Sequence, residues 1–257
     1  MSAGVPGDPY ARPPAPPTQG VSVPVPRFRP VWTYVFLAAN VAIWAVVYFT
    51  WDGLGSKLVN LGVKADELIA QGEYWRLLTA MFLHIQIVHI FSNMLALYAL
   101  GPQVESTFGH ARFLAVYFLS GLLGSALSFL LSPDPSLGAS GAIYGLLGAL
   151  VAYLVRNRQG FGEYGQRRLM NLLGVIGINL LLTISVPYID LWGHAGGLLG
   201  GLALGWALTP VYRLDRDDLW GMPRVVDAGS PRVRLVVTAA VTLVLVAVVV
   251  AGTLRWS

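Results

Sequence analysis

Seven apolar runs divide the sequence after residue 30. They span approximately Val31–Trp51, Ile87–Leu100, Phe113–Leu131, Ala139–Val155, Leu169–Val186, Leu191–Leu208 and Leu235–Leu254. Most approach the ~20 residues that a helix needs to cross a bilayer. The second and fourth runs are short, and several contain Gly, Ser, His or Asn, which are tolerated where helices bury one another or line a wet cavity. The pattern predicts an all-α, polytopic membrane protein.

The composition supports this fold class and removes several others. Of the 257 residues, 55% are hydrophobic and 12% are charged, whereas a soluble domain carries roughly 25% charged residues. The chain has no cysteine, which excludes disulfides and cysteine-based chemistry. Its net charge of +4 is not gathered into a basic stripe with interleaved aromatic residues, so we expect no nucleic-acid partner.

The organisation along the chain follows from the same pattern. Residues 1–27 form a Pro-rich segment without the apolar region of a signal peptide, and we expect a disordered cytoplasmic tail; binding of a partner to its extended Pro-rich stretches remains an alternative. Residues 28–213 hold six helices and form the predicted core. A cytoplasmic linker over 214–234 and a seventh helix within 235–257 follow.

The basic residues predict the orientation. If the N-terminus is cytoplasmic and the helices alternate, thirteen of the 17 Lys and Arg residues lie on the inner side, as the positive-inside rule requires. The C-terminus is then external, and the chain belongs in the cell membrane. The first external loop, Asp52–Leu83, is semi-apolar and contains Tyr74 and Trp75. Tyr and Trp favour the membrane interface, so we expect this loop to be partly embedded.

Three clusters of polar residues interrupt the apolar runs. The first is His84, His89 and Asn93. His89 and Asn93 are four residues apart and share one face of the second helix. Side chains of this kind also hold membrane helices together by hydrogen bonds, and the cluster alone does not distinguish that role from a functional one.

The second cluster surrounds Ser140, where a loop meets the fourth apolar run. Gly138, Ser140 and Tyr144 lie within the segment GASGAIYG, and Ser140 and Tyr144 share a helix face. The residues Gly138-x-Ser140 match the first half of the Gly-x-Ser-x-Gly pattern found at the nucleophile turn of α/β hydrolases. No strand precedes this serine, so the sequence does not favour that fold.

The third cluster joins His194 to a ridge of glycines in the sixth helix. These glycines recur every fourth residue, at Gly193, Gly197, Gly201 and Gly205. The fourth helix carries a similar pair four residues apart, and small-xxx-small ridges allow two helix backbones to approach closely. We therefore expect the fourth and sixth helices to pack through these ridges.

Such packing would bring Ser140 and His194 together, because both lie near the external ends of helices that run in the same direction. Histidine is a suitable base for a serine hydroxyl. The N–H groups of His89, Asn93 and the Ser140 backbone would be donors to a developing oxyanion. Asp190 is expected to cap or flank the sixth helix rather than to orient His194. On the other side of that helix we expect Leu204 to face lipid.

The motifs and their order resemble the rhomboid family of intramembrane serine proteases. The resemblance covers about Phe28–Arg213 and rests on the following residues: Trp75-Arg76, His84…His89…Asn93, Glu105 with Gly109 and Arg112, Gly138-x-Ser140-x-x-x-Tyr144, and His194-x-x-Gly197-x-x-x-Gly201. The seventh helix is an addition to the six-helix core of many bacterial members.

The resemblance implies a role for each site residue. Ser140 would be the nucleophile and His194 its base, with His89 and Asn93 in the oxyanion hole. The Tyr144 ring would pack on the imidazole, while His84, Gly138, Gly197 and Gly201 would be structural. The family needs no cofactor or metal. Its substrates are membrane-anchored proteins, cleaved near the outer end of a transmembrane helix beside small residues, and the fifth helix would be their side gate.

Two other classes of function remain to be compared with this one. A catalytically inactive rhomboid-like protein would bind membrane proteins without cutting them, although such relatives usually lack the Ser or the His. A transporter would be expected to show inverted repeats or paired broken helices, and the sequence shows no convincing repeat. Neither the physiological substrate nor the oligomeric state follows from the sequence.

Overall fold

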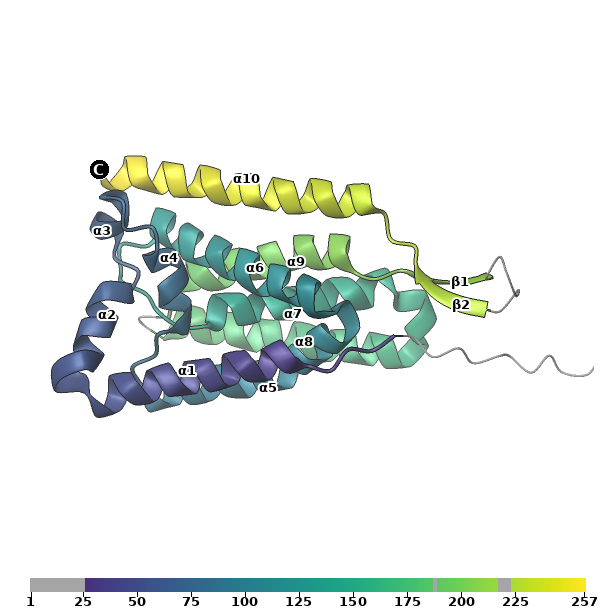
Figure 1. The fold of residues 1–257 in the computed structure, drawn as a ribbon, viewed down its shortest axis with the longest axis horizontal. Helices are drawn as coiled ribbons and strands as arrows, with labels where there is room; N and C mark the ends of the chain where they lie inside the picture. The colour runs from purple at the N-terminus through teal and green to yellow at the C-terminus, as the bar shows by residue number, and fades with distance from the viewer. Residues whose placement is uncertain (1–25, 187–188, 217–222) are drawn as a thin grey trace, which may run out of the picture.

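The computed structural model describes residues 26–186, 189–216 and 223–257; all but the last two residues of the predicted tail 1–27 lie outside these ranges. Long helices run roughly along one axis (Figure 1). They are α1 (Val31–Phe49), α5 (Ile87–Phe108), α6 (His110–Leu131), α7 (Ser140–Arg156), α8 (Arg158–Ser185), α9 (Leu191–Leu208) and α10 (Pro231–Trp256). Each of the seven apolar runs lies within or largely within one of them.

The predicted first external loop is built of short helical segments at one end of the bundle (Figure 1). In order they are a π-helical turn η1 (Trp51–Gly55), α2 (Ser56–Gly62), α3 (Asp66–Ala70), α4 (Arg76–Thr79) and a 3₁₀ turn η2 (Ala80–Phe82). Arg76 is buried. Its guanidinium donates to the carbonyls of Asn60 and Val63 and to the Glu73 carboxylate, so the loop is closed upon itself.

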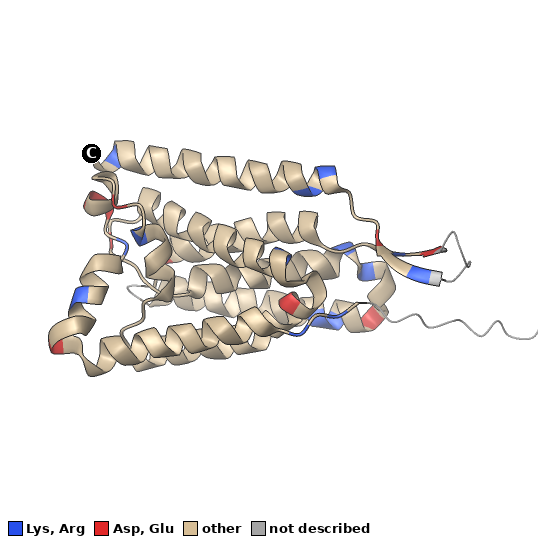
Figure 2. Ribbon diagram, in the orientation of Figure 1, with Lys and Arg blue, Asp and Glu red and all other residues tan. Residues whose placement is uncertain are grey.

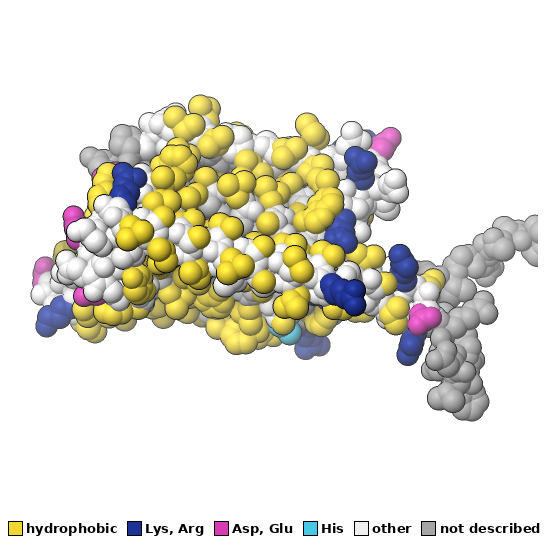
Figure 3. Space-filling model, turned by 90° about the horizontal axis from the view of Figure 1, so that it is seen from above, with side chains coloured by type: hydrophobic (Ala, Val, Ile, Leu, Met, Phe, Trp, Pro, Cys, Tyr) yellow, Lys and Arg dark blue, Asp and Glu magenta, His cyan; other side chains and the backbone are white. Residues whose placement is uncertain are grey.

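Length and apolarity make this a multi-pass membrane protein. Within the described ranges, five helices are long and apolar enough to cross a membrane, namely α1, α5, α6, α8 and α10, and α7 is a shorter apolar helix. Charged residues gather toward the two ends of the bundle (Figure 2). Between the ends, a broad surface of hydrophobic side chains is exposed (Figure 3), which suits contact with lipid rather than water.

Helix α5 is longer than the apolar run Ile87–Leu100 predicted, because it continues to Phe108 through Pro102. Glu105 explains the extension. Its carboxylate is fully buried and accepts hydrogen bonds from the backbone N–H and the hydroxyl of Thr33 at the start of α1. The polar end of α5 therefore serves as an N-terminal cap for another helix, which hydropathy alone does not reveal.

The predicted linker 214–234 contains regular structure. Strand β1 (Tyr212–Arg216) pairs antiparallel with β2 (Pro223–Asp227), with Tyr212 opposite Asp227. Helix α10 then begins at Pro231 rather than at residue 235. An all-α class therefore describes the membrane part of the chain, and this small hairpin projects from the end of the bundle opposite α3 (Figure 1).

Asp227 joins the hairpin to two helices. Its carboxylate pairs with Arg112 at the start of α6 and with Arg234 in the first turn of α10, and it accepts from the Gly229 N–H at 2.9 Å. Burial alone would raise the pKa of Asp227, but these hydrogen bonds and the Arg112 charge hold it at about 2. This junction fixes one end of α10 against α6.

The predicted contact between the fourth and sixth helices is present as α7 against α9. A Cβ atom added to Gly197 would overlap the Gly141 carbonyl, and one added to Gly201 would overlap the Gly145 carbonyl. The two backbones are thus in direct contact along the ridge, with no room for a side chain between them. Close van der Waals packing of this kind holds membrane helices together, since lipid provides no hydrophobic driving force.

Helix α9 carries a second glycine face, which was not predicted. Added Cβ atoms would meet Gly124 and Leu123 of α6 from Gly196, and Ser120 from Gly200. Helix α9 is therefore enclosed by α6 and α7. The prediction that Leu204 faces lipid is wrong, because this side chain is fully buried in the core; two packed faces leave little of α9 for lipid.

Candidate active site

Ser140 is the first residue of α7, and His194 lies in the first turn of α9. The distance between Ser140 Oγ and His194 Nε2 is 2.9 Å, which is a hydrogen bond. The Tyr144 ring, one turn beyond Ser140, stacks on the imidazole with centroids 4.2 Å apart and an interplanar angle of 15°. The glycine contacts between α7 and α9 place these three side chains together.

Thr183 of α8 is a further partner of the imidazole and was not singled out from the sequence. Its Oγ1 lies 3.1 Å from His194 Nδ1 and 2.8 Å from the Asn179 carbonyl. A hydroxyl has one proton. When Thr183 donates it to the carbonyl, its oxygen accepts from the Nδ1–H of His194, and Nε2 is left free to accept a proton from Ser140.

Nothing in the local sequence marks Thr183 as functional. It lies in an apolar run with leucine and isoleucine on either side, and a threonine that bonds the carbonyl four residues back is common in membrane helices. Its near-complete burial on a largely exposed helix is the structural signal that distinguishes it.

Asp190 caps α9, as its position before the helix suggested. Its Oδ1 accepts from the Gly193 N–H at 2.8 Å, which satisfies one of the free N–H groups at the start of the helix. The carboxylate also lines a small cavity of about 30 Å³ beside Ser140, together with Ser136 and Gly138. A cavity of this size accommodates a water molecule or a very small side chain.

Gly138, His84 and His89 meet just before Ser140. Gly138 has φ +126°, a conformation that residues with a side chain rarely adopt. A Cβ there would lie 2.6 Å from His89 Nε2, so the imidazole of α5 reaches the backbone that leads into Ser140. His84 Nε2 accepts the Ala139 N–H at 3.3 Å, and the two imidazoles lie edge to face with centroids 4.9 Å apart.

Asn93 is buried on the same face of α5 as His89. Its Nδ2 donates to the His89 carbonyl at 3.0 Å. The structure therefore brings His89 to the loop before Ser140, while the Asn93 amide is held on its own helix. A second N–H remains on the same nitrogen.

Metal ligation finds no support in this region. Among the residues that the structure describes, no group of three or more His, Asp or Glu side chains is arranged to hold a metal ion. The absence of a cofactor stays a prediction. The polar groups that converge here are suited to acyl transfer instead: a hydroxyl, an imidazole, and N–H donors at a helix N-terminus.

The fold and the site together define a multi-pass helical membrane protein with a Ser–His pair at a glycine-lined helix contact. Comparison with known proteins agrees with this description. Residues 71–211 match the family model of the rhomboid domain. This match covers more than half of the chain, and the chain belongs to the rhomboid family.

Three curated relatives show the extent of the similarity. The chain is 43% identical over 182 residues to Rhomboid protease GluP of Bacillus subtilis (strain 168), covering 70% of this chain and 35% of that protein. It is 36% identical over 172 residues to RHOMBOID-like protein 7 of Arabidopsis thaliana, covering 65% and 54%. It is 41% identical over 143 residues to RHOMBOID-like protein 2 of the same plant, covering 55% and 44%. The chain thus spans about a third to a half of the length of these relatives.

Proposed function

We propose that this protein is an intramembrane serine endopeptidase that cleaves the transmembrane segments of membrane-anchored proteins. The observation that carries the proposal is the hydrogen bond of 2.9 Å between Ser140 Oγ and His194 Nε2. Membership of the rhomboid family and the similarity to a protein named as a rhomboid protease support it.

The geometry suits a Ser–His dyad. Ser140 attacks the scissile carbonyl while His194 Nε2 takes the hydroxyl proton, and the imidazolium then donates this proton to the amine as the C–N bond breaks. Water, deprotonated by the same imidazole, hydrolyses the acyl ester and restores the Ser140 hydroxyl. Thr183 at Nδ1 selects the tautomer in which Nε2 is unprotonated. Tyr144 holds the ring plane by stacking. In this proposal the uncharged Thr183 hydroxyl orients the imidazole, as the carboxylate does in a Ser-His-Asp triad.

The oxyanion donors are proposed from their positions around Ser140. The Ser140 N–H lies at the N-terminus of α7, where the first N–H groups have no intrahelical partner and the helix dipole favours negative charge. His89 approaches the same loop at Gly138. Asn93 would contribute its second N–H. Such donors act most strongly when they are aimed at the oxyanion before the reaction.

Orientation and substrate access complete the proposal. Basic residues are most numerous at the hairpin end (Figure 2), so that end is assigned to the cytoplasm, and Ser140 lies toward the external side. Residues 28–213 would be the protease core. Only 6% of the apolar stretch of helix α8 is buried inside the protein. Because few contacts hold this helix, we assign it as the side gate for a transmembrane substrate in the bilayer.

Labelling and cleavage together test the function. The purified wild type in detergent should react with a serine-directed fluorophosphonate probe and cleave a model transmembrane substrate. Ser140→Ala should lose both activities while melting like the wild type. Ser106→Ala is the matched control, because Ser106 lies in α5 near the opposite end of the bundle and its hydroxyl donates to the Gln103 carbonyl of the same helix.

Two outcomes would contradict the proposal. Cleavage by Ser140→Ala at near the wild-type rate would remove Ser140 from the mechanism. A folded wild type that neither labels nor cleaves, yet captures transmembrane proteins, would favour the inactive binding protein instead.

A further inference from the structure

The loop that ends at Ser140 begins where α6 ends, at Leu131. The last carbonyls of a helix have no partner within it, and near a bilayer such groups must find donors elsewhere. The groups that donate hydrogen bonds to these carbonyls therefore determine how firmly the start of the loop is held. They come from two segments that are distant in sequence, α10 and the loop between α1 and α5.

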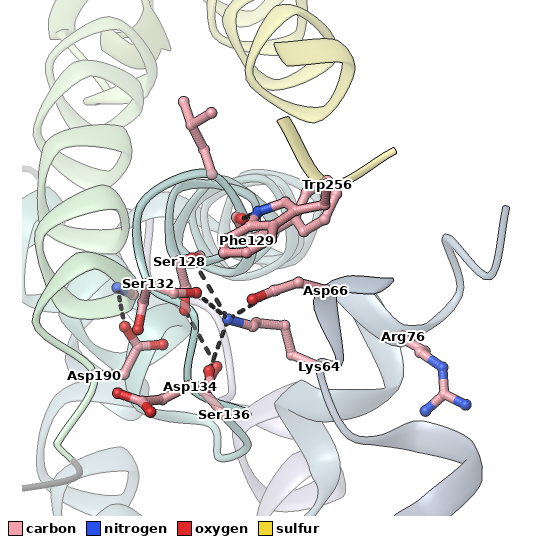
Figure 4. A network of polar contacts seen from close by, with 12 residues as sticks. Lys64, Asp66, Arg76, Ser128, Phe129, Ser132, Asp134, Ser136, Asp190 and Trp256 are labelled. Carbon is pink, nitrogen blue, oxygen red and sulfur yellow. Dashed lines mark hydrogen bonds and ion pairs between the residues drawn. The ribbon is translucent and has the colours of Figure 1, made fainter. Parts of the chain in front are cut away.

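Two donors come from the last turn of α10. Trp256 Nε1 donates to the Phe129 carbonyl at 2.7 Å, and Arg255 Nη1 donates to the Leu130 carbonyl at 2.7 Å. Arg255 also lies over the Trp256 ring, 4.9 Å from its centroid. Figure 4 shows the indole of Trp256 over the end of α6, with Phe129 beneath it.

Lys64 is the third donor, and it is fully buried. Its Nζ donates to the carbonyls of Ser132 at 2.9 Å and Asp134 at 2.8 Å, and lies 3.5 Å from the Ser128 carbonyl. Asp66 Oδ1 balances its charge at 2.9 Å. Figure 4 shows this ammonium at the centre of a ring of oxygen atoms. One lysine thus joins the last turn of α6 to the first residues of the loop that ends at Ser140.

The rest of the loop is fixed to the same neighbours. The backbones of Lys64 and Ser136 exchange a pair of hydrogen bonds of 3.1 and 3.3 Å, and the Gly138 N–H donates to the Ala80 carbonyl at 2.8 Å. A displacement at the end of α6 would therefore be carried through a tied segment to Ser140, since little free chain is left between them to absorb it.

Packing holds the last turn of α10 in place. A Cβ added to Gly252 would overlap the Phe129 ring, and Trp256 packs with Phe129 against the buried Ile69 and Leu77. Tyr74 OH lies 3.4 Å from Thr253 Oγ1. The last turn of α10 therefore contacts α6 and the loop that carries Lys64 at once.

We propose that the last turn of α10 and Lys64 form a clamp on the end of α6 that positions Ser140, with Trp256 and Lys64 as positioning residues for catalysis. The proposal rests on the proposed function and adds a role for the seventh helix. Displacing a reacting group by ~1 Å can cost about 10²-fold in rate. A weakened clamp should thus lower the turnover rate before it unfolds the protein.

Trp256→Phe tests the clamp with little change in packing, because it keeps an aromatic ring and removes the N–H donor. We expect kcat to fall about 3- to 10-fold, the range for one neutral hydrogen bond, with KM unchanged. The rate of fluorophosphonate labelling at Ser140 should fall by the same factor. Leu254→Ala is the matched control in the same turn, because Leu254 is 78% exposed. All rates are measured well below the Tm of each variant.

A second variant tests the lysine. Lys64→Met alone would leave the Asp66 carboxylate buried without its partner, which is strongly destabilising, so Lys64→Met is combined with Asp66→Leu. We expect a larger loss of kcat than for Trp256→Phe. Adding Trp256→Phe to that background should have less effect than it has in the wild type, because both changes act on one helix end.

Separate outcomes would overturn separate claims. An active wild type whose Trp256 and Lys64 variants melt at lower temperature but cut and label at wild-type rates would show that the clamp only stabilises the fold. A wild type that neither cuts nor labels would overturn the proposed function, and this proposal with it.

Discussion

The glycines in the apolar part of α8 and those on the α9 face toward α7 have opposite surroundings. Gly174 and Gly177 of α8 have open space where a side chain would be, whereas Gly197 and Gly201 of α9 lie against the backbone of α7. Yet both helices send a residue to the same site, and Thr183 from α8 meets His194 from α9 at 3.1 Å. The site thus combines a rigid half, set by backbone contact, with a peripheral half that reaches it through one side chain.

The difference shows that glycine can have two structural roles in a membrane helix. Along α9 it is the condition for helix contact, because any side chain would separate the backbones. Along α8 it leaves a smooth, exposed surface on a helix that few neighbours hold. A local opening of α8 requires breaking few contacts, which agrees with its proposed role as a gate.

The greatest loss is expected when a side chain is inserted between α7 and α9. If the proposed function is right, Gly201→Leu should lower the cleavage rate about 10²-fold or more, although a Cβ at Gly201 would meet Gly145 rather than Ser140 or His194. It should also lower the Tm in detergent. Leu199→Ala on the same helix is the control, because Leu199 is 60% exposed.

A cleavage rate and a melting curve for each variant decide this prediction. If Gly201→Leu cuts and melts like the wild type, the glycine contact is not what brings Ser140 to His194.

An intermediate effect is expected from the contribution of α8. Thr183→Val keeps the shape of the side chain and removes the oxygen that receives the Nδ1–H. We expect kcat to fall roughly 10-fold, as for the loss of one hydrogen bond, with KM nearly unchanged. Thr183→Ser should restore most of the rate.

Ile184→Ala, at a residue that is 67% exposed on the same helix, is the control for general disturbance of α8. A wild-type kcat for Thr183→Val would mean that His194 is oriented by Tyr144 alone.

The smallest effect is expected from adding one methyl group to α8. The added methyl group of Gly177→Ala would meet no atom within 4 Å, and alanine favours a helix over glycine by up to roughly 1 kcal/mol. The cleavage rate should therefore stay the same, and the Tm should stay the same or rise slightly. Gly201→Ala is the same chemical change on α9 and should be damaging, because its Cβ would overlap the Gly145 carbonyl. Equal losses in the two variants would show that α8 also packs closely in the protein in detergent.

Several features could be predicted from the sequence because they depend on local composition or fixed spacing. Apolar length locates the long helices, and the four-residue glycine period predicts which face of α9 meets α7. The pairing of Ser140 with His194 follows from that face and from the common direction of the two helices. Their distance of 2.9 Å agrees with this prediction, while their catalytic roles stay proposals.

Other features could not be predicted, because they depend on partners far away in the sequence. Nothing near Thr183 indicates that it meets an imidazole, and the burial of Leu204 follows from a second glycine face against α6. The end of α5 was missed because Glu105 is polar, although it is buried as the cap of α1. The pairing of β1 with β2 was missed in a segment without a strong apolar pattern.

The amino-acid pattern was sufficient to predict the class of protein, the approximate positions of its membrane helices, and the serine and histidine that lie within hydrogen-bond distance. These properties follow from hydropathy, helical periodicity and side-chain type, which act over a few turns of chain. The partners of these residues, and of the loop before Ser140, depend on the tertiary structure: Thr183 at the imidazole, and Lys64 and Trp256 at the end of α6. A buried hydrogen bond forms wherever the fold brings a donor to an unpaired acceptor, and that meeting is set by packing across the whole bundle.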